Sequence, residues 1–137
     1  MTRVYVDAGT WIALAMPDDS HHQEARAFFR QQARGLVLVT SNLVLTETFT
    51  FLRYRKQLRG ATSAHESVNA SERLGLLELV WVTREIHDAA WEIYDRYDDQ
   101  AFSFTDCPSF VIARRQNVDY VFGFDADFRT MGFDLRP

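Results

Sequence analysis

Short apolar runs alternate along the chain with longer segments in which apolar residues recur at helical spacing. The runs RVYV (3–6), LVLVT (36–40), LELVWV (77–82) and VDYVFGF (118–124) are rich in β-branched and aromatic residues, as buried strands are. Apolar residues three and four positions apart fill the segments between them, which is typical of helices packed on one face. This alternation predicts βαβ units around a central parallel sheet, and therefore a single α/β domain over residues 1–137.

Turn and capping residues predict where the helices begin and end. They predict a short helix that ends before Pro17, a second from a Ser20 cap to Gly35, and a third over 42–58. A fourth begins with a capping box at 63–66 and ends at Gly75. A fifth runs from a Thr83 cap to Asp98, and a sixth begins near Thr105. Pro108 then falls in a first helical turn, where its missing N–H group costs little.

Composition narrows the class of protein. Hydrophobic residues make up 47% of the 137 residues, yet every apolar stretch is well short of the ~20 residues that a membrane span requires. The start MTRVYVDAGTW has the pattern of a strand and lacks the order of a secretory signal, so we expect a soluble, cytoplasmic protein without a membrane partner. Cys107 is the one cysteine, which excludes an internal disulfide and a cysteine-rich zinc site. The three tryptophans are expected in the core or at helix contacts.

The net charge does not by itself decide whether nucleic acid is a substrate. A formal charge of −4 argues against broad attraction to phosphates. Two bound divalent ions would bring that charge to −4 + 4 = 0. All but one of the 15 basic residues are arginine, the better bidentate partner for phosphate, and Lys56 is the exception.

Four acidic residues lie beside or inside apolar runs, where a solvated surface acid would be out of place. They are Asp7, Glu47, Asp106 and Asp125. Few cations accompany them: the base nearest to Glu47 is Arg53, six residues on. Burying several carboxylates together is unfavourable unless cations neutralise them, and carboxylate oxygens suit Mg²⁺ or Mn²⁺. The pattern therefore predicts a divalent-metal site.

The predicted elements bring these acids toward one edge of the sheet. Asp7 and Asp125 follow the carboxyl ends of two strands, where an open parallel sheet forms its binding crevice. Asp106 lies at the positive end of a helix, and helical spacing turns Glu47 toward the core or a cleft. Alternatives stay open, because Asp7 and Asp106 could be helix-capping or first-turn acids and Asp125 could form an ordinary Asx turn.

Four segments in this order resemble the PIN-domain ribonucleases, and in particular the short VapC-type toxins of toxin–antitoxin pairs. The segments are VDAGTWIAL, VLTETFTFL, FSFTDCPSF and FGFDADF, and the resemblance covers nearly the whole chain. It implies a three-layer α/β/α fold with a central parallel sheet flanked by helices. It also implies that Asp7, Glu47, Asp106 and Asp125 are the catalytic and metal-binding set, with Asp127 as an adjacent reserve. The chain departs from the family at Gly123, where a threonine is common.

The family resemblance further implies hydrolysis of RNA phosphodiesters with Mg²⁺ or Mn²⁺, and a small antitoxin whose tail occupies the acidic crevice. Helices that carry Phe28, Phe29, Phe49 and Phe51 offer apolar surface for a partner or a homodimer, although core packing accounts for most of it. Two alternatives remain: a PIN-like module that binds RNA or protein without cleavage, and a housekeeping PIN nuclease. Motifs for nucleotide-binding loops and for a serine nucleophile are missing from the sequence.

Overall fold

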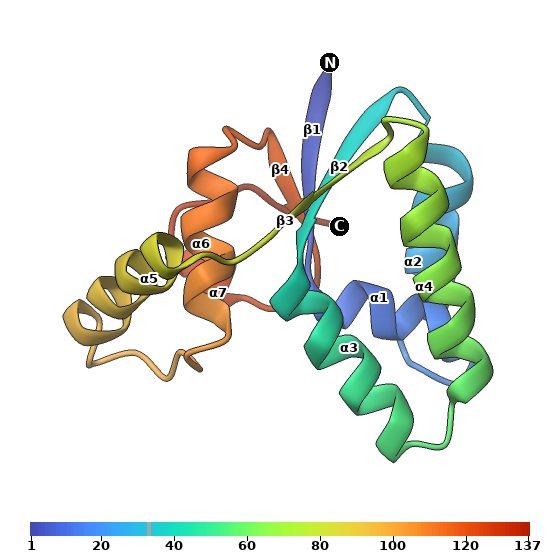
Figure 1. Cartoon of the computed structure of the whole chain (residues 1–137), viewed down its shortest axis with the longest axis horizontal. Helices are drawn as coiled ribbons and strands as arrows, with labels where there is room; N and C mark the ends of the chain where they lie inside the picture. Colours follow the sequence, from blue (N-terminus) through green and yellow to red (C-terminus); the bar gives the residue numbers. More distant parts are fainter. Residues whose placement is uncertain (33) are drawn as a thin grey trace.

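Five parallel strands form one sheet in the centre of the molecule, in the order β3-β2-β1-β4-β5 (Figure 1). The computed structural model describes residues 1–32 and 34–137. The strands are β1 (Thr2–Val6), β2 (Leu36–Ser41), β3 (Leu77–Val80), β4 (Tyr120–Phe122) and β5 (Leu135–Arg136). The helical elements are α1 (Ala8–Ala15), α2 (His22–Ala27), the π-helical turn η1 (Phe28–Gln32), α3 (Asn42–Tyr54), α4 (Leu58–Arg73), α5 (Arg84–Arg96), α6 (Asp106–Arg115) and α7 (Asp127–Thr130).

Helices cover both faces of this sheet. Figure 1 shows α1, α2 and α4 on one side and α5, α6 and α7 on the other, while α3 leaves the end of β2 and runs away from the sheet. The predicted three-layer α/β/α arrangement is therefore confirmed.

The central strand is buried from both faces, as expected of a strand covered by helices on each side. Val4, Tyr5 and Val6 have no exposed surface, and Val39 of β2 and Val121 of β4 are equally buried beside them. Residue register is regular, with Val4 opposite Leu38 and Tyr5 opposite Val121 in the neighbouring strands. Continuous β-branched runs thus predicted these strands correctly, although β3 and β4 are shorter than the apolar runs that contain them.

Side-chain caps fix two of the helix starts where the sequence predicted them. Ser41 Oγ accepts a hydrogen bond from the Val44 N–H at 3.1 Å, and Thr83 Oγ1 accepts one from the Ile86 N–H at 3.3 Å. Pro108 is the third residue of α6, in its first turn. The Ser20 cap is wrong, because α2 begins at His22 and its N-cap residue is His21.

The boundary between α3 and α4 differs from the prediction. Helix α3 ends at Tyr54, and Lys56 takes a positive φ of 57°, so the predicted continuation to residue 58 is wrong. Helix α4 already begins at Leu58 and runs through Gly60, whose added Cβ would lie 2.9 Å from the Ala15 carbonyl oxygen. Gly60 therefore serves close packing of α4 against α1, and not the helix break that its residue type suggests.

Two aromatic predictions were only partly right. Trp11 is 3% exposed and lies in the core, but Trp81 and Trp91 are 65% and 54% exposed. Phe28 is buried, whereas Phe29, Phe49 and Phe51 are half-buried, and Phe29 and Phe49 pack against the core. Core packing therefore accounts fully for only one of these four phenylalanines.

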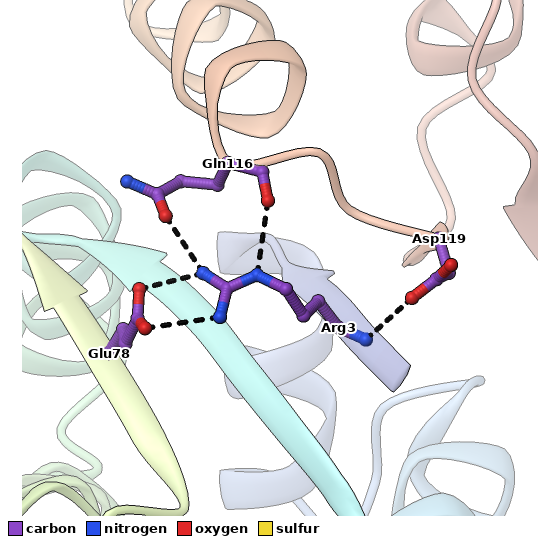
Figure 2. A network of polar contacts seen from close by, with 4 residues as sticks. All are labelled: Arg3, Glu78, Gln116 and Asp119. Atoms are coloured by element: carbon purple, nitrogen blue, oxygen red, sulfur yellow. Dashed lines mark hydrogen bonds and ion pairs between the residues drawn. The ribbon is translucent and has the colours of Figure 1, made fainter. Parts of the chain in front are cut away.

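A polar network holds the edge of the sheet opposite the carboxyl ends of the strands (Figure 2). The guanidinium of Arg3 in β1 reaches Glu78 in β3, with Nη2–Oε2 at 2.7 Å and Nη1–Oε1 at 3.1 Å. Arg3 Nε also donates to the Gln116 carbonyl at 3.0 Å, and the Arg3 N–H donates to Asp119 Oδ2 at 2.8 Å. The hydrogen bond from Arg3 lowers the pKa of Glu78. This network ties β1 to β3 and to the α6–β4 connection.

Within the described ranges 1–32 and 34–137, none of the helices combines the length and the apolar character needed to cross a membrane.

Candidate active site

The strand order brings the predicted acids together at one edge of the sheet. β1 lies between β2 and β4, so the carboxyl ends of these three strands are neighbours. Asp7 directly follows β1, Asp125 follows β4 by three residues, and α3 with Glu47 starts where β2 ends. The chain also changes direction across the sheet beside β1, which makes this edge the topological switch point where α/β folds bind ligands.

Buried hydroxyl groups fix the ends of these strands. Thr10 Oγ1 donates to the carbonyl of Phe122, the last residue of β4, at 2.9 Å. Thr40 Oγ1 donates to the carbonyl of Val6, the last residue of β1, at 3.0 Å, and accepts from Trp11 Nε1 at 3.3 Å. The sequence prediction did not single out Thr10 and Thr40. The signal for Thr10 was its place in VDAGT, three residues after the first acid.

Asp7 occupies the N-cap position of α1 without acting as a side-chain cap. Its backbone is extended, its carboxylate accepts no capping hydrogen bond, and its side chain is half-buried. Burial, followed by the negative charges of Glu47, Asp106 and Asp125, raises the pKa of Asp7 to about 7. A capping role alone is therefore not supported for this acid.

Three acids form the tightest group. Asp106, Asp125 and Asp127 each offer a carboxylate oxygen, and these oxygens lie within 4.8 Å of one another. Asp106 opens α6 and accepts the Ser103 N–H at 3.2 Å, while Asp125 accepts the Asp127 N–H at 2.9 Å. Burial and then the charge of Asp125 raise the pKa of both Asp106 and Asp127. Asp127 is therefore part of the cluster, a closer role than the reserve position expected from the sequence.

Asp125 does form the Asx turn that the sequence offered as an alternative, but the turn alone does not explain why three carboxylates meet here. The hydrogen bond to the Asp127 N–H forms that turn. The same turn places the two carboxylates side by side and opposite Asp106, which an isolated surface turn does not require.

Glu47 approaches the cluster from α3. The residue is exposed, so the expectation that it points to the core is wrong, and its place in a cleft stays a prediction. Its carboxyl end is shielded all the same: burial, then the charges of Asp106 and Asp125, raise the pKa of Glu47. Glu47 and Asp7 are outside the 4.8 Å group, but the charges of Asp106 and Asp125 contribute to the raised pKa of both carboxyl groups.

None of the described basic side chains forms an ion pair with the acidic cluster. In the part of the chain that the structure describes, the ion pairs of arginine and histidine go to other acids, and none involves the five acids of the site. Oxygen donors gathered without a cationic partner fit a hard divalent ion, whose charge would offset both their burial and their mutual repulsion.

Comparison with known proteins gives the family of the chain. A model of the PIN domain matches residues 4–134. The chain belongs to the PIN-domain family. This PIN domain is 34% identical over 136 residues to the 23S rRNA-specific endonuclease VapC20 of Mycobacterium tuberculosis, with 98% of each chain covered. It is 26% identical over 134 residues to a VapC ribonuclease of Archaeoglobus fulgidus, covering 94% of this chain and 82% of the relative.

Solved structures agree with this assignment. The crystal structure of Mycobacterium tuberculosis VapC20, described as a Sarcin-Ricin loop cleaving toxin, matches this PIN domain with a TM-score of 0.82 at 33% identity and covers 98% of this chain and 99% of that one. VapBC2 from Rickettsia felis, bound to a DNA fragment from their promoter, matches with a TM-score of 0.71 at 12% identity over 98% of each chain, and this likeness concerns the fold alone. The expected family, with its VapC-type ribonuclease branch, is confirmed.

Proposed function

We propose that this PIN domain is the ribonuclease toxin of a toxin–antitoxin pair and hydrolyses RNA phosphodiesters with bound Mg²⁺ or Mn²⁺. The observation that carries the proposal is the cluster of Asp106, Asp125 and Asp127, with Asp7 and Glu47 beside it and no paired cation in the described residues. The VapC relatives support the same activity, since their names describe ribonucleases.

The carboxylates have distinct tasks in this proposal. Asp106, Asp125 and Asp127 would hold a divalent ion, and Asp7 would join them, since a nearby cation favours the ionised form of a carboxyl group whose pKa burial and neighbouring charges raise to about 7. Such an ion supplies an activated water and stabilises negative charge on the phosphate. The Ser103 N–H holds the Asp106 carboxylate in place within this arrangement.

In this proposal Glu47 would accept a proton from the attacking water. Its exposure on α3 and its raised pKa, which makes it a better proton acceptor than a free glutamate, support this role. The site therefore needs no side-chain nucleophile. This mechanism agrees with the absence of a serine or cysteine nucleophile motif from the sequence.

The chemistry is tested by the ends of the RNA products. Attack by water, with departure of the 3′ oxygen, leaves a 5′-phosphate and a 3′-hydroxyl group, and mass spectrometry of a cleaved oligonucleotide distinguishes them. Products with 2′,3′-cyclic phosphates would contradict the mechanism, because they form when the 2′-hydroxyl of the RNA itself attacks.

The substrate we propose is a structured loop of the large ribosomal RNA. Identity of 34% across 98% of both chains to a 23S rRNA-specific endonuclease supports it. Incubation of wild-type protein with intact ribosomes, followed by mapping of RNA 5′ ends, should reveal one dominant cut in the large-subunit RNA. Scattered cleavage of many RNAs would instead favour the housekeeping-nuclease alternative. The ribosomal substrate supports our further proposal that the protein acts in the cytoplasm.

The partner we propose is a small antitoxin that inserts a basic segment, such as an arginine, into the acidic crevice. The uncompensated charge of the five carboxylates supports this choice of partner. Co-expression with the product of the adjacent reading frame should yield a complex that no longer cleaves RNA. Unchanged cleavage in the presence of that product would refute the antitoxin and leave the nuclease proposal intact.

A further inference from the structure

Positive charge is concentrated in one short segment at the far end of the helix that carries Glu47. Residues 48–65 contain Arg53, Arg55, Lys56 and Arg59 and no aspartate or glutamate. The segment therefore carries +4, and the other residues carry −4 − 4 = −8. All four cations are exposed, and in the described part of the chain none of them forms an ion pair. We name residues 53–59, which join α3 to α4, the basic tip.

The basic tip is connected to the active site by one face of α3. Glu47, Phe51 and Arg55 follow one another at four-residue intervals, so they form a row along the helix. The guanidinium of Arg55 lies over the Phe51 ring, 4.7 Å from its centre. Eight residues of helix separate Glu47 from Arg55, which corresponds to about 12 Å along the axis. Figure 1 shows α3 extending from the sheet to this tip, with α4 returning beside it.

An aromatic ring stands beside these cations. Tyr54 is 80% exposed and lies seven residues beyond Glu47, again on the same side of α3. It borders a groove of about 360 Å³ between α3 and α4, which Arg53 and Leu58 also line. An exposed ring next to guanidinium groups is the combination that single-stranded RNA sites use, with bases stacked on the ring and phosphates held by the cations.

Helix electrostatics alone do not account for this cluster. Arg53 in the last turn of α3 is favourable at the negative end of the helix dipole. Arg59 is the second residue of α4, at the positive end, where a cation is unfavourable. The first turn of α4 also contains no acid and receives no side-chain cap. The helix dipole therefore does not account for Arg59 at this helix start.

We propose that the basic tip binds phosphates of the RNA strand that flanks the cleavage site, and that Tyr54 stacks on an unpaired base of that strand. The inference deepens the proposed function and rests on it, since it assigns substrate recognition to residues outside the acidic cluster. Charge complementarity favours RNA as the occupant, because the four exposed cations of the tip attract a negatively charged polymer, and the row along α3 leads from the tip to Glu47.

RNA binding is measured with wild-type protein and a fluorescent single-stranded RNA of mixed sequence, in EDTA so that cleavage cannot proceed. The test variant is Arg55→Ala with Arg59→Ala, and the control is Arg26→Ala with Arg73→Ala, which removes the same charge from exposed positions elsewhere. Loss of two phosphate contacts should reduce the slope of log affinity against log salt by about 1.4, because each contact to a single strand contributes ~0.7. The control should keep the wild-type slope.

Stacking is tested separately. Tyr54→Ala should weaken RNA binding about 5- to 150-fold, the range expected for one base–aromatic stack, while Tyr54→Phe should retain the wild-type affinity. Tyr94→Ala, at an aromatic residue that is 40% exposed on α5, is the matched control and should have no effect. Because Tyr54 is 80% exposed, its replacement should leave the protein folded. Thermal melting of each variant checks this.

The outcomes separate this inference from the proposed function. Equal affinity and equal salt slope in the tip variants and their controls would refute the inference, even if the wild-type protein cleaves RNA. A change of oligomeric mass in Tyr54→Ala, with RNA affinity unchanged, would also refute it and would make the tip a protein interface. Failure of the wild-type protein to cleave any RNA with Mn²⁺ would overturn the proposed function, and the EDTA binding result would still stand.

Discussion

Replacing Asp7 by asparagine should stabilise the metal-free protein at alkaline pH while it impairs metal binding. The pKa of Asp7 is raised from 3.8 to about 7 by burial and by the neighbouring carboxylates. Ionisation of this group in the folded protein is therefore unfavourable by up to about 4 kcal/mol, at ~1.36 kcal/mol for each pH unit. Water and mobile ions reduce this figure, because the side chain is only half-buried. Asparagine removes the penalty and keeps nearly the same shape.

The sign of the pH dependence follows from which state binds the proton. Between pH 3.8 and about 7 the folded protein keeps the Asp7 proton and the unfolded chain has lost it. The contribution of Asp7 to the stability of the wild-type protein therefore falls as the pH rises through that range. The advantage of Asp7→Asn over wild type should grow across the same range and stay constant above about pH 7.

Urea unfolding in EDTA at pH 5 and pH 8 measures this difference. Asp18→Asn is the control, because Asp18 is exposed and remote from the cluster in sequence. Added Mn²⁺ at a hundred times its dissociation constant should stabilise the wild-type protein by about 2.7 kcal/mol and the variant by less. Equal stability of Asp7→Asn and wild type at pH 8, or a loss of stability in the variant, would refute the argument that the acids repel one another.

Three further changes test the fold around the site. Arg3→Met should lower the free energy of unfolding by about 1–2 kcal/mol at pH 7. The loss should be smaller below pH 4.5, because Glu78 becomes protonated there. Chemical denaturation checks this, and unchanged stability would contradict a stabilising role of the network. Gly60→Ala should cost about 1–3 kcal/mol, because its Cβ would lie 2.9 Å from the Ala15 carbonyl oxygen, and a thermal melt no lower than that of wild type would show that the helices can separate. Gly123→Ala should fold normally, since the nearest atom to the added Cβ would be 3.8 Å away; a lower melting temperature would contradict this.

Much of the site could be predicted from the sequence because parallel strands end at one edge. Asp7 and Asp125 follow buried apolar runs, so the βαβ pattern placed both at the carboxyl edge of the sheet, while the family resemblance added which strands are neighbours. The closeness of Asp127 to Asp106 could not be predicted in this way, because it depends on the turn that the Asp125 carboxylate forms. Exposure of Glu47 was missed since apolar neighbours in the sequence suggested a buried face, and α3 instead projects from the sheet.

The remaining differences concern short or closely packed elements. Helix α7 and the two-residue strand β5 are too brief to show a periodic pattern, and β5 forms only by pairing with β4. The early start of α4 escaped prediction because Gly60 usually weakens a helix, and only its contact with α1 explains its place there. Tertiary packing, which a local pattern does not contain, decided these elements.

Cleavage of the large-subunit RNA in intact ribosomes tests the central claim most directly, with purified wild-type protein in Mg²⁺ or Mn²⁺, the same protein in EDTA, and Asp7→Asn in metal. A metal-dependent ribonuclease built on the acidic cluster predicts cleavage by wild-type protein with metal, none in EDTA, and a severe loss in the variant. Cleavage that persists in EDTA, or that Asp7→Asn retains in full, would contradict the account.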